Sequence, residues 1–409
     1  MELVITRCAG LDVHKATVVA TARVPDDQGR RRIVTETFGT MTPDLIALRE
    51  WLQAYGVTHV ALESTGVYWK PVYYVLEDAF ELLLINMLEL KRVPGRKTDV
   101  KDSEWLAQLL ECGLLRSSFV PPPPIRELRD VTRYRVQQTR ERSREVNRLQ
   151  QVLEDAGVKV TSVLTDVMGA SGRAMVEALV SGTTDPQILA DLARGKLRQK
   201  LPALQRALVG RFRPVHAFLL EQILAKIDYL DEALDRLTAE IDRRVTPFES
   251  MLTGLDTIPG INRIGAISLV AETGGDMSRF PSSAHLCSWA GMCPGHDESA
   301  GKRRSGKTRK ANRYLRTTLI QAGVAGSHKK DSALRALYGR VKGRRGHKKA
   351  VVAVGHQILE IAYYVMRDGV TYRELGPDYF QRRDRDRTAR RHVKQLEALG
   401  YVVTVQPAA

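Results

Sequence analysis

The sequence predicts an α/β domain followed by two helical regions. Three observations support this prediction: strand-like and helix-like patterns alternate over about the first 115 residues, four prolines interrupt the chain at 121–124, and two long amphipathic helical patterns lie beyond them. Alternating elements of both kinds favour helices layered on a sheet. With 43% hydrophobic residues among 409, the chain can build several cores.

Apolar spacing assigns the elements of the first region in order. Continuous or alternating apolar runs predict strands, and apolar positions three and four apart predict helices. Strands are expected at 3–24 (running into a hairpin), 30–40, 57–64 and 80–87, and helices at 43–56, 68–79 and 102–115. Mixed strands first and αβ units afterwards resemble a ribonuclease-H-like layered fold. This inventory alone does not separate it from other α/β folds.

The proline run marks a boundary, because consecutive prolines form a stiff linker. From Arg126 to about Gly157 the chain has the pattern of one long polar helix, and 215–245 has that of a second, amphipathic one. Residues 158–212 between them are less regular. The two long patterns predict a helical hairpin or coiled coil, suited to dimerisation or to spacing two active domains along a nucleic acid.

A third, helix-rich region begins at Phe248. Its "IPG" turn at 258–260 lies between two helical patterns and resembles a helix-hairpin-helix, whose amides hold a phosphate backbone. An ordinary helix turn explains this short motif nearly as well. The sequence thus predicts four parts, at 1–119, 120–247, 248–375 and, as a basic tail, 376–409.

Basic residues exceed acidic ones by a wide margin. Lys and Arg number 63 against 47 Asp and Glu, a formal charge of +16, which indicates a polyanionic partner. Between Lys302 and Lys349 there are 17 Lys or Arg and one acid, Asp331, so this stretch repels itself unless an anion is bound. Because there is no run of about 20 apolar residues, and Arg7 and Lys15 come too early for a secretory signal, we expect nucleic acid and no membrane.

The four cysteines are predicted to be free thiols. Cys8, Cys112, Cys287 and Cys293 form no CxxC pair. Cys287, Cys293 and His296 do not have the spacing of a common zinc finger. Free thiols are typical of a reducing compartment, so we expect a cytoplasmic or nucleoid-associated protein.

Four acidic residues of the first region stand where strands end or helices begin. Asp12 lies within a strand pattern and Glu63 closes another. Asp99 and Asp102 open a helix, three residues apart and therefore on one face. A buried unpaired carboxylate costs several kcal/mol, so Asp12 needs a partner. Because Mg²⁺ takes oxygen ligands from separate elements, often as two ions about 4 Å apart, these four carboxylates suit a metal site.

Each of these carboxylates also has a structural explanation. The last two have the placement of a helix N-cap and its first-turn acid. Glu63 can accept turn amides, and Asp12 can pair with Lys15 or Arg7. On the residues alone, the metal site and these structural roles are about equally supported.

Residues 288–319 place a serine among cations. Ser299 lies in a turn of small residues, and the cations of 302–304 follow at once. A serine attacks a phosphodiester when it is activated and when cations neutralise the developing charge. The simpler interpretation is a flexible basic loop in which Ser299 and Ser305 are solvated and the cations only grip phosphates. Residue chemistry alone favours it, because no obvious histidine base adjoins the serine, although His296 is close in sequence.

Five segments of the chain are distinctive in their order. They are GLDVHK (10–15), ALESTGVYW (61–69), GRKTDVKDSEWLAQLL (95–110), IPGI (258–261) and WAGMCPGHDESAGKRRSGKTRKANRYLR (289–316). This order resembles that of DEDD-type insertion-sequence transposases, the insertion-sequence one-ten family, which is related to Piv-type DNA invertases. The resemblance covers 1–115 and about 250–370, and its specific parts are the third and fifth segments.

The resemblance implies a RuvC-like N-terminal domain whose carboxylates Asp12, Glu63, Asp99 and Asp102 bind Mg²⁺ or Mn²⁺. It also implies that Ser299 forms a phosphoserine link with DNA. Nucleic acid would be held by basic residues after the serine, namely Lys302, Arg303, Arg304, Lys307, Arg309, Lys310 and Arg313.

The partners that the resemblance implies are donor and target DNA and a structured non-coding RNA of the element, a bridge RNA that pairs with both. The chain would act as a homodimer or homotetramer, with serine and metal sites from different subunits, on the nucleoid of a bacterial cytoplasm.

The serine segment departs from the family pattern, which reads Ser-Ser-Gly-Gly-Lys. Here it is ESAGK, so Glu298 and Ala300 replace a serine and a glycine, and Ala311 stands where glycine is usual. We identify Ser299 as the nucleophile and Ser305 as its rival. Two alternatives are a metal-dependent junction nuclease that uses water and leaves the serine idle, and a non-catalytic nucleic-acid-binding protein.

Overall fold

The structure is a computed structural model that describes residues 4–64, 66–86, 102–295, 297–299, 302–383 and 385–404. The chain divides into two compact units, Met1–Pro121 and Pro122–Ala409. Asp99, His296, Ala300 and Gly301 lie outside the described residues.

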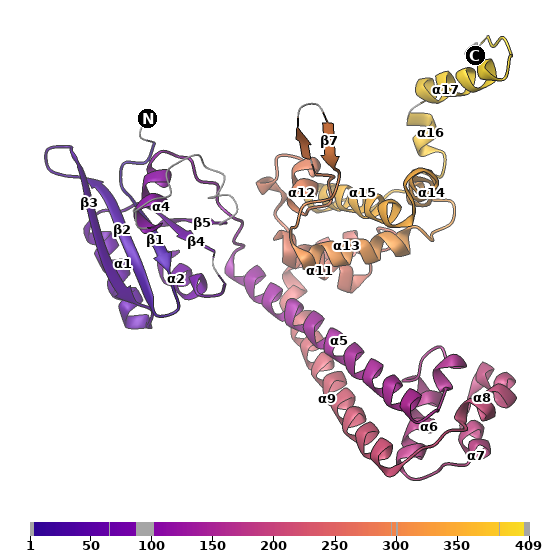
Figure 1. Ribbon diagram of the computed structural model, residues 1–409. Coiled ribbons are helices and arrows are strands. Elements are labelled where there is room, and N and C mark those ends of the chain that lie inside the picture. The colour runs from indigo at the N-terminus through magenta and orange to yellow at the C-terminus, as the bar shows by residue number, and fades with distance from the viewer. Residues whose placement is uncertain are drawn as a thin grey trace. The chain divides into compact units, whose positions relative to one another are not determined.

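The first unit is built on a mixed five-stranded sheet (Figure 1). Its strands are β1 (Cys8–Val13), β2 (Thr17–Pro25), β3 (Arg31–Gly39), β4 (His59–Glu63) and β5 (Glu81–Ile85), in the spatial order β3-β2-β1-β4-β5. The first three strands pair antiparallel, whereas β4 is parallel to both β1 and β5. This mixed sheet is consistent with the expected ribonuclease-H-like α/β domain.

Helices cover both faces of this sheet. They are α1 (Thr42–Ala54), α2 (Trp69–Leu76) and α4 (Asp102–Glu111). Successive strand residues point to opposite faces. On one face, Leu11 and Leu62 pack with Leu48 of α1. On the other face, strand residues such as Ala61 pack with Leu106 of α4 in a separate core. One face of β1 therefore carries α4 alone among the helices described here.

Helix α4 is held against the sheet by close backbone contact and by a buried ion pair. A Cβ atom on Gly10 would lie 2.2 Å from the carbonyl oxygen of Ser103, so glycine is required where the helix crosses β1. Ser103 and Thr21 share a buried hydrogen bond of 2.8 Å. At the other end of α4, Arg23 donates to the buried carboxylate of Glu111 at 2.8 Å, and Arg31 also pairs with it.

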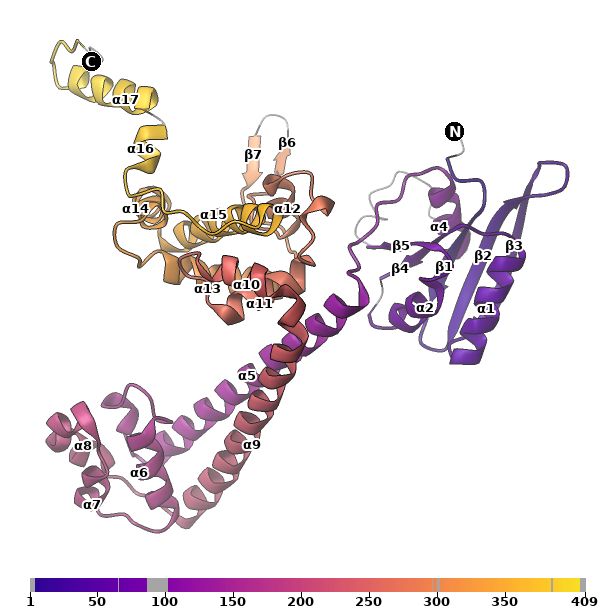
Figure 2. The same cartoon turned by 180° about the vertical axis from the view of Figure 1, so that it is seen from behind.

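The second unit begins with a helical hairpin. Helices α5 (Pro123–Asp155) and α9 (Pro214–Val245) run side by side in both views (Figure 1, Figure 2). They are antiparallel, since Arg135 bonds to Thr238 and Arg142 pairs with Asp231. The end of the hairpin carries a small cluster formed by η1 (Val160–Ser162), α6 (Ala170–Val180), α7 (Pro186–Asp191), η2 (Gly195–Lys200) and α8 (Leu201–Leu208).

The rest of the second unit is mostly helical. Its elements are η3 (Thr246–Phe248), α10 (Glu249–Asp256), α11 (Arg263–Thr273), η4 (Met277–Arg279), α12 (Ser283–Trp289), β6 (Asp297–Ser299), β7 (Lys302–Ser305), α13 (Arg313–Gly326), α14 (Ala333–Arg345), α15 (His347–Asp368), α16 (Tyr379–Arg383) and α17 (Arg385–Ala398). Apolar residues of α15, such as Ile358 and Leu359, lie in one core with residues from α10 to α14 and with Ile125 and Leu128 of α5.

The "IPG" turn is a tight junction in this core. Gly260 has φ +93°, and a Cβ atom there would lie 2.2 Å from the carbonyl oxygen of Ala322 in α13. Glycine is therefore needed both for the left-handed backbone and for the close approach.

Candidate active site

Three of the four expected carboxylate residues stand where their elements end or begin at one end of the sheet: Asp12 in β1, Glu63 in β4 and Asp102 in α4. The parallel strands β1 and β4 pair from Cys8 with His59 to Leu11 with Leu62. Asp12 and Glu63 are the next residue of each strand, so they occupy equivalent positions where the two strands end. Because residues two apart share a face, both carboxylates lie on the face that α4 covers.

The direction of α4 brings Asp102 to the same edge. Ser103 crosses β1 at Gly10, and the carbonyl of Ala107 accepts from the Cys8 thiol at 3.5 Å, further back along the strand. The helix therefore runs antiparallel to β1 and begins at the end where Asp12 lies. Asp102, its first residue, is exposed.

Asp12 is less buried than the sequence predicted. It is the fifth of the six residues of β1, and its side chain is 21% exposed. Its Oδ2 atom lies 3.1 Å from Nε2 of His14, whereas the expected partner Arg7 donates instead to the carbonyl of Tyr55. The difference arises because Leu11 and Val13 are buried on one face of the strand, whereas Asp12 points to the other face, where α4 begins only at Asp102.

The donor set at this edge suits a hard divalent cation. Carboxylate oxygens are the ligands that Mg²⁺ and Mn²⁺ prefer. Within the described part of the chain, no three His, Cys, Asp or Glu side chains lie close enough together to hold one ion. Asp99, the expected fourth ligand, lies outside the described residues.

The serine segment forms a β-hairpin. Ser299 ends β6 and pairs in register with Lys302, the first residue of β7, and Glu298 pairs with Arg303. Pro294 and Thr308 bridge at its base, where the amide of Gly295 donates to the carbonyl of Lys307 at 3.0 Å. The expected flexible loop is therefore an ordered hairpin in its described residues. The two strands pair, instead of forming a loop without regular structure, because the contacts at the base hold their ends together.

The expected nucleic-acid-binding residues lie along and after this hairpin. Lys302, Arg303 and Arg304 belong to β7, and Arg313 opens α13. Exposed side chains at the hairpin and beyond it include Lys302, Lys307, Arg309, Lys310 and Arg313. The rival nucleophile Ser305 already accepts a hydrogen bond from the Lys307 amide at 3.2 Å. The carboxylates belong to the first unit and Ser299 to the second.

A buried carboxylate that sequence analysis missed anchors the helix after the hairpin. Glu272 of α11 is 2% exposed and accepts two hydrogen bonds from Arg133 of α5, at 2.7 and 2.6 Å. It also accepts from Asn312 at 2.5 Å, and the side chain of Asn312 caps α13 by accepting from the Tyr314 amide. The sequence signal is a lone acid in the apolar helix "ISLVAET".

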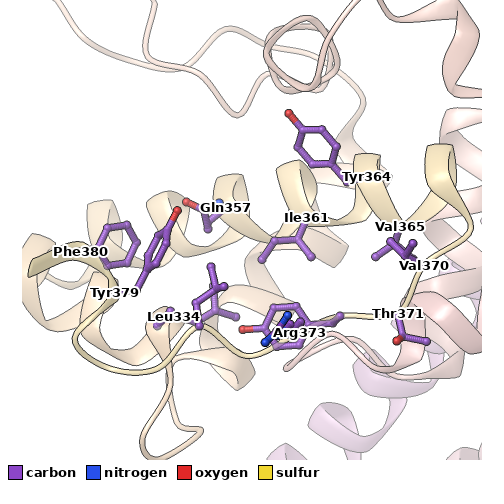
Figure 3. A pocket seen from close by; sticks show the side chains of 13 residues that line it. Leu334, Gln357, Ile361, Tyr364, Val365, Val370, Thr371, Arg373, Tyr379 and Phe380 are labelled. Carbon is purple, nitrogen blue, oxygen red and sulfur yellow. The ribbon is translucent and has the colours of Figure 1, made fainter. Parts of the chain in front are cut away.

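The cysteines and an apolar cavity supply no catalytic group to this site. All four cysteines are free, and burial raises the pKa of Cys8 to about 11. A cavity of about 190 Å³ between α14 and α15 is lined by apolar and aromatic residues such as Ile361, Tyr364 and Phe380 (Figure 3), and no acid is among its described lining residues.

No helix in the described ranges is long and apolar enough to cross a membrane.

The structure thus combines a mixed sheet that has acidic residues at the ends of its parallel strands with a helical second unit that carries a basic hairpin. A family model described as "Transposase", for DEDD transposases of IS110 elements, matches residues 9–157. A second, "Transposase IS116/IS110/IS902 family", matches residues 253–339. The chain belongs to the IS110 family of DEDD transposases.

Two curated relatives are similar over shorter stretches. The chain is 32% identical over 127 residues to the "Insertion element IS110 uncharacterized 43.6 kDa protein" of Streptomyces coelicolor, which is 30% of each chain. It is 33% identical over 122 residues to the "Insertion element IS900 uncharacterized 42 kDa protein" of Mycobacterium paratuberculosis, which is 28% of this chain and 29% of the relative. The matched part thus spans less than a third of these relatives.

Proposed function

We propose that this protein is the transposase of an insertion element, which cuts DNA strands and joins them to new partners. The observation that supports the proposal is that Asp12 and Glu63 occupy equivalent positions at the ends of two parallel strands, with α4 beginning at Asp102 at the same end, in a chain of a transposase family. Metal ions held by carboxylates act on phosphodiesters, and a DNA strand supplies these groups. The net charge of +16 favours the binding of DNA.

Asp12, Glu63, Asp99 and Asp102 would hold Mg²⁺ or Mn²⁺. The bound ion would neutralise charge on the scissile phosphate. His14, whose Nε2 is 3.1 Å from the Asp12 carboxylate, holds that side chain in position at the strand end.

Ser299 is the proposed nucleophile. Its Oγ forms a bond to phosphorus, the bond from phosphorus to the 3′ oxygen breaks, and that oxygen leaves as a hydroxyl by taking up a proton. The 3′ hydroxyl of another strand then attacks the phosphoserine and releases Ser299. The cations from Lys302 to Arg313 neutralise phosphate charge in both steps. This role is supported by the position of Ser299 in a hairpin, paired with the exposed Lys302 and followed by exposed cations such as Lys307.

The remaining partners follow the family resemblance. A structured RNA of the element would select donor and target DNA by base pairing, while the protein would hold backbone and shape. Two or four copies would assemble, and the carboxylates of one would act with Ser299 of another. The proposal is supported by the location of the two groups in separate compact units.

Strand cleavage tests the proposed role of the carboxylates. Labelled DNA carrying the element's junction, with RNA transcribed from its flanks, is incubated with protein and Mg²⁺. Wild type should cut, and chelation or Asp12→Asn should abolish cutting. Glu36→Gln, which removes an exposed acid from β3, should cut like wild type. Metal-independent cleavage, or full activity in Asp12→Asn, would refute the role of this edge.

A further inference from the structure

A cavity of about 210 Å³ lies between α5, α11 and α13. Its described lining residues include Arg133, Arg140 and Glu272, together with Tyr314 at the second position of α13. Helices that are far apart in the sequence meet here: Gln137 of α5 donates a hydrogen bond to the hydroxyl of Tyr314 in α13, 177 residues away. The cavity belongs to the second unit alone.

Three guanidinium groups surround the ring of Tyr314. The Cζ atoms of Arg133 and Arg313 each lie 4.9 Å from the ring centroid, and that of Arg140 lies 5.8 Å away. The hydroxyl of Tyr314 accepts hydrogen bonds from Arg313 at 3.0 Å and from Gln137 at 3.3 Å. An aromatic face attracts such cations, but three of them around one ring repel one another.

The charges around this ring are not balanced within the protein. Glu272 is the one carboxylate among the described lining residues, and Arg133 occupies both of its oxygens. Over the part of the chain that the structure describes, neither Arg140 nor Arg313 has a carboxylate within ion-pair distance. Arg140 lines the cavity and Arg313 lies beside the same Tyr314 ring at the protein surface, so two positive charges flank one ring without a counter-charge, which indicates an anionic ligand.

The phenol itself responds to this excess of positive charge. Partial burial alone would raise the pKa of Tyr314. The hydrogen bonds from Gln137 and Arg313 and the charges of Arg313 and Arg133 outweigh burial and lower it. The surroundings thus favour a negative charge at the ring edge, in agreement with the ion-pair geometry.

We infer that Arg140, Arg313 and Tyr314 form a phosphate-binding site on the second unit; of the three, Arg313 alone was already expected to bind nucleic acid. Its ligand is a phosphate group, and a phosphodiester of a nucleic-acid backbone is the source that rests on the proposed function. Guanidinium groups bind phosphate through paired donors, and the ring stacks beside them. Arg140 and Tyr314 are added by this inference to the nucleic-acid-binding surface.

Ionisation of Tyr314 reports on the occupant directly. The difference in tyrosinate absorbance between wild type and Tyr314→Phe gives its titration. A bound phosphate disfavours the phenolate, so inorganic phosphate should move that titration to higher pH than chloride of equal ionic strength. A short DNA duplex of unrelated sequence should do the same at a much lower concentration. Absence of a shift with either probe would overturn the site, and a shift with inorganic phosphate alone would overturn the backbone as its source.

Matched variants test which arginine is responsible. Arg140→Gln should abolish the shift and reduce the salt slope of duplex binding by about one. Arg144→Gln removes the same charge from an exposed position one turn along α5, outside the cavity, and should keep the shift. Equal loss in both variants would contradict the site. These readouts involve no strand cleavage, so they can fail while the proposed transposase activity stands, and the reverse also holds.

Discussion

The surroundings of the Asp12 carboxylate differ from those that the sequence predicted. The sequence predicted a buried acid that needs a metal or a basic partner, whereas the structure places it next to last in β1, partly exposed and beside His14. Its desolvation therefore does not call for a metal. The proposed metal site is supported instead by the position of Asp12 level with Glu63 and near the start of α4.

Glu272 should be among the most destabilising residues to remove. Glu272→Ala leaves Arg133 buried without its bidentate partner and Asn312 without an acceptor. We expect the free energy of unfolding to fall by about 3–5 kcal/mol, measured by denaturant titration. As a control, Glu127→Ala breaks a surface pair with Arg244 and should cost less than about 1 kcal/mol. Equal effects would show that the Glu272 cluster does not anchor α11 to α5.

Cys8 predicts a loss of stability in alkaline solution. Burial raises the pKa of its thiol from the usual 9.0 to about 11, so between these values the unfolded chain releases a proton that the folded protein keeps. The free energy of unfolding therefore falls as pH rises, by about 2 kcal/mol at pH 11. Denaturant titration of Cys8→Ala should show a smaller decline than wild type over this range. An equal decline in both proteins would contradict the prediction.

At the scale of single elements, α4 links fold and site. It is pressed against β1 at Gly10, and its first residue is Asp102. Gly10→Ala would place a Cβ atom 2.2 Å from the carbonyl oxygen of Ser103. The helix must shift, at a cost of about 1–3 kcal/mol, and strand cleavage should drop with it.

The control for this variant is a glycine with open space around it. Gly339→Ala in α14 meets nothing within 4 Å and should leave stability unchanged or raised by up to about 1 kcal/mol. Thermal unfolding and cleavage rates of both variants are compared with wild type. Normal cleavage by a Gly10→Ala protein that is destabilised as expected would show that the position of α4 does not matter to the site.

Local pattern predicts the elements of the first unit well. The strands β3, β4 and β5 lie inside the ranges expected from apolar alternation, and α4 begins at the expected residue. Contacts between distant segments are not encoded in that pattern. The hairpin at Ser299 depends on its base at Pro294 and Thr308, and the cluster around Tyr314 depends on α5 lying against α13. Spacing along the chain shows neither.

For the whole molecule, the division into two units leads to a mixing prediction. The carboxylates lie in one unit and Ser299 in the other, and we propose that groups from different subunits act together. Asp12→Asn and Ser299→Ala proteins, each inactive, should regain part of the cleavage activity when mixed, because some assemblies then contain an intact pair. No recovery in mixtures that form the same oligomer as wild type would place both groups in one subunit.

The proposed mechanism depends on a covalent link between Ser299 and DNA. Protein, Mg²⁺, RNA from the native flanks and labelled junction DNA are combined and separated on a denaturing gel. We predict a protease-sensitive band of labelled DNA with shifted mobility, which is absent with Ser299→Ala and with Asp12→Asn. Free nicked DNA from both wild type and Ser299→Ala, but not from Asp12→Asn, would contradict it and identify a metal-dependent nuclease that leaves the serine unused.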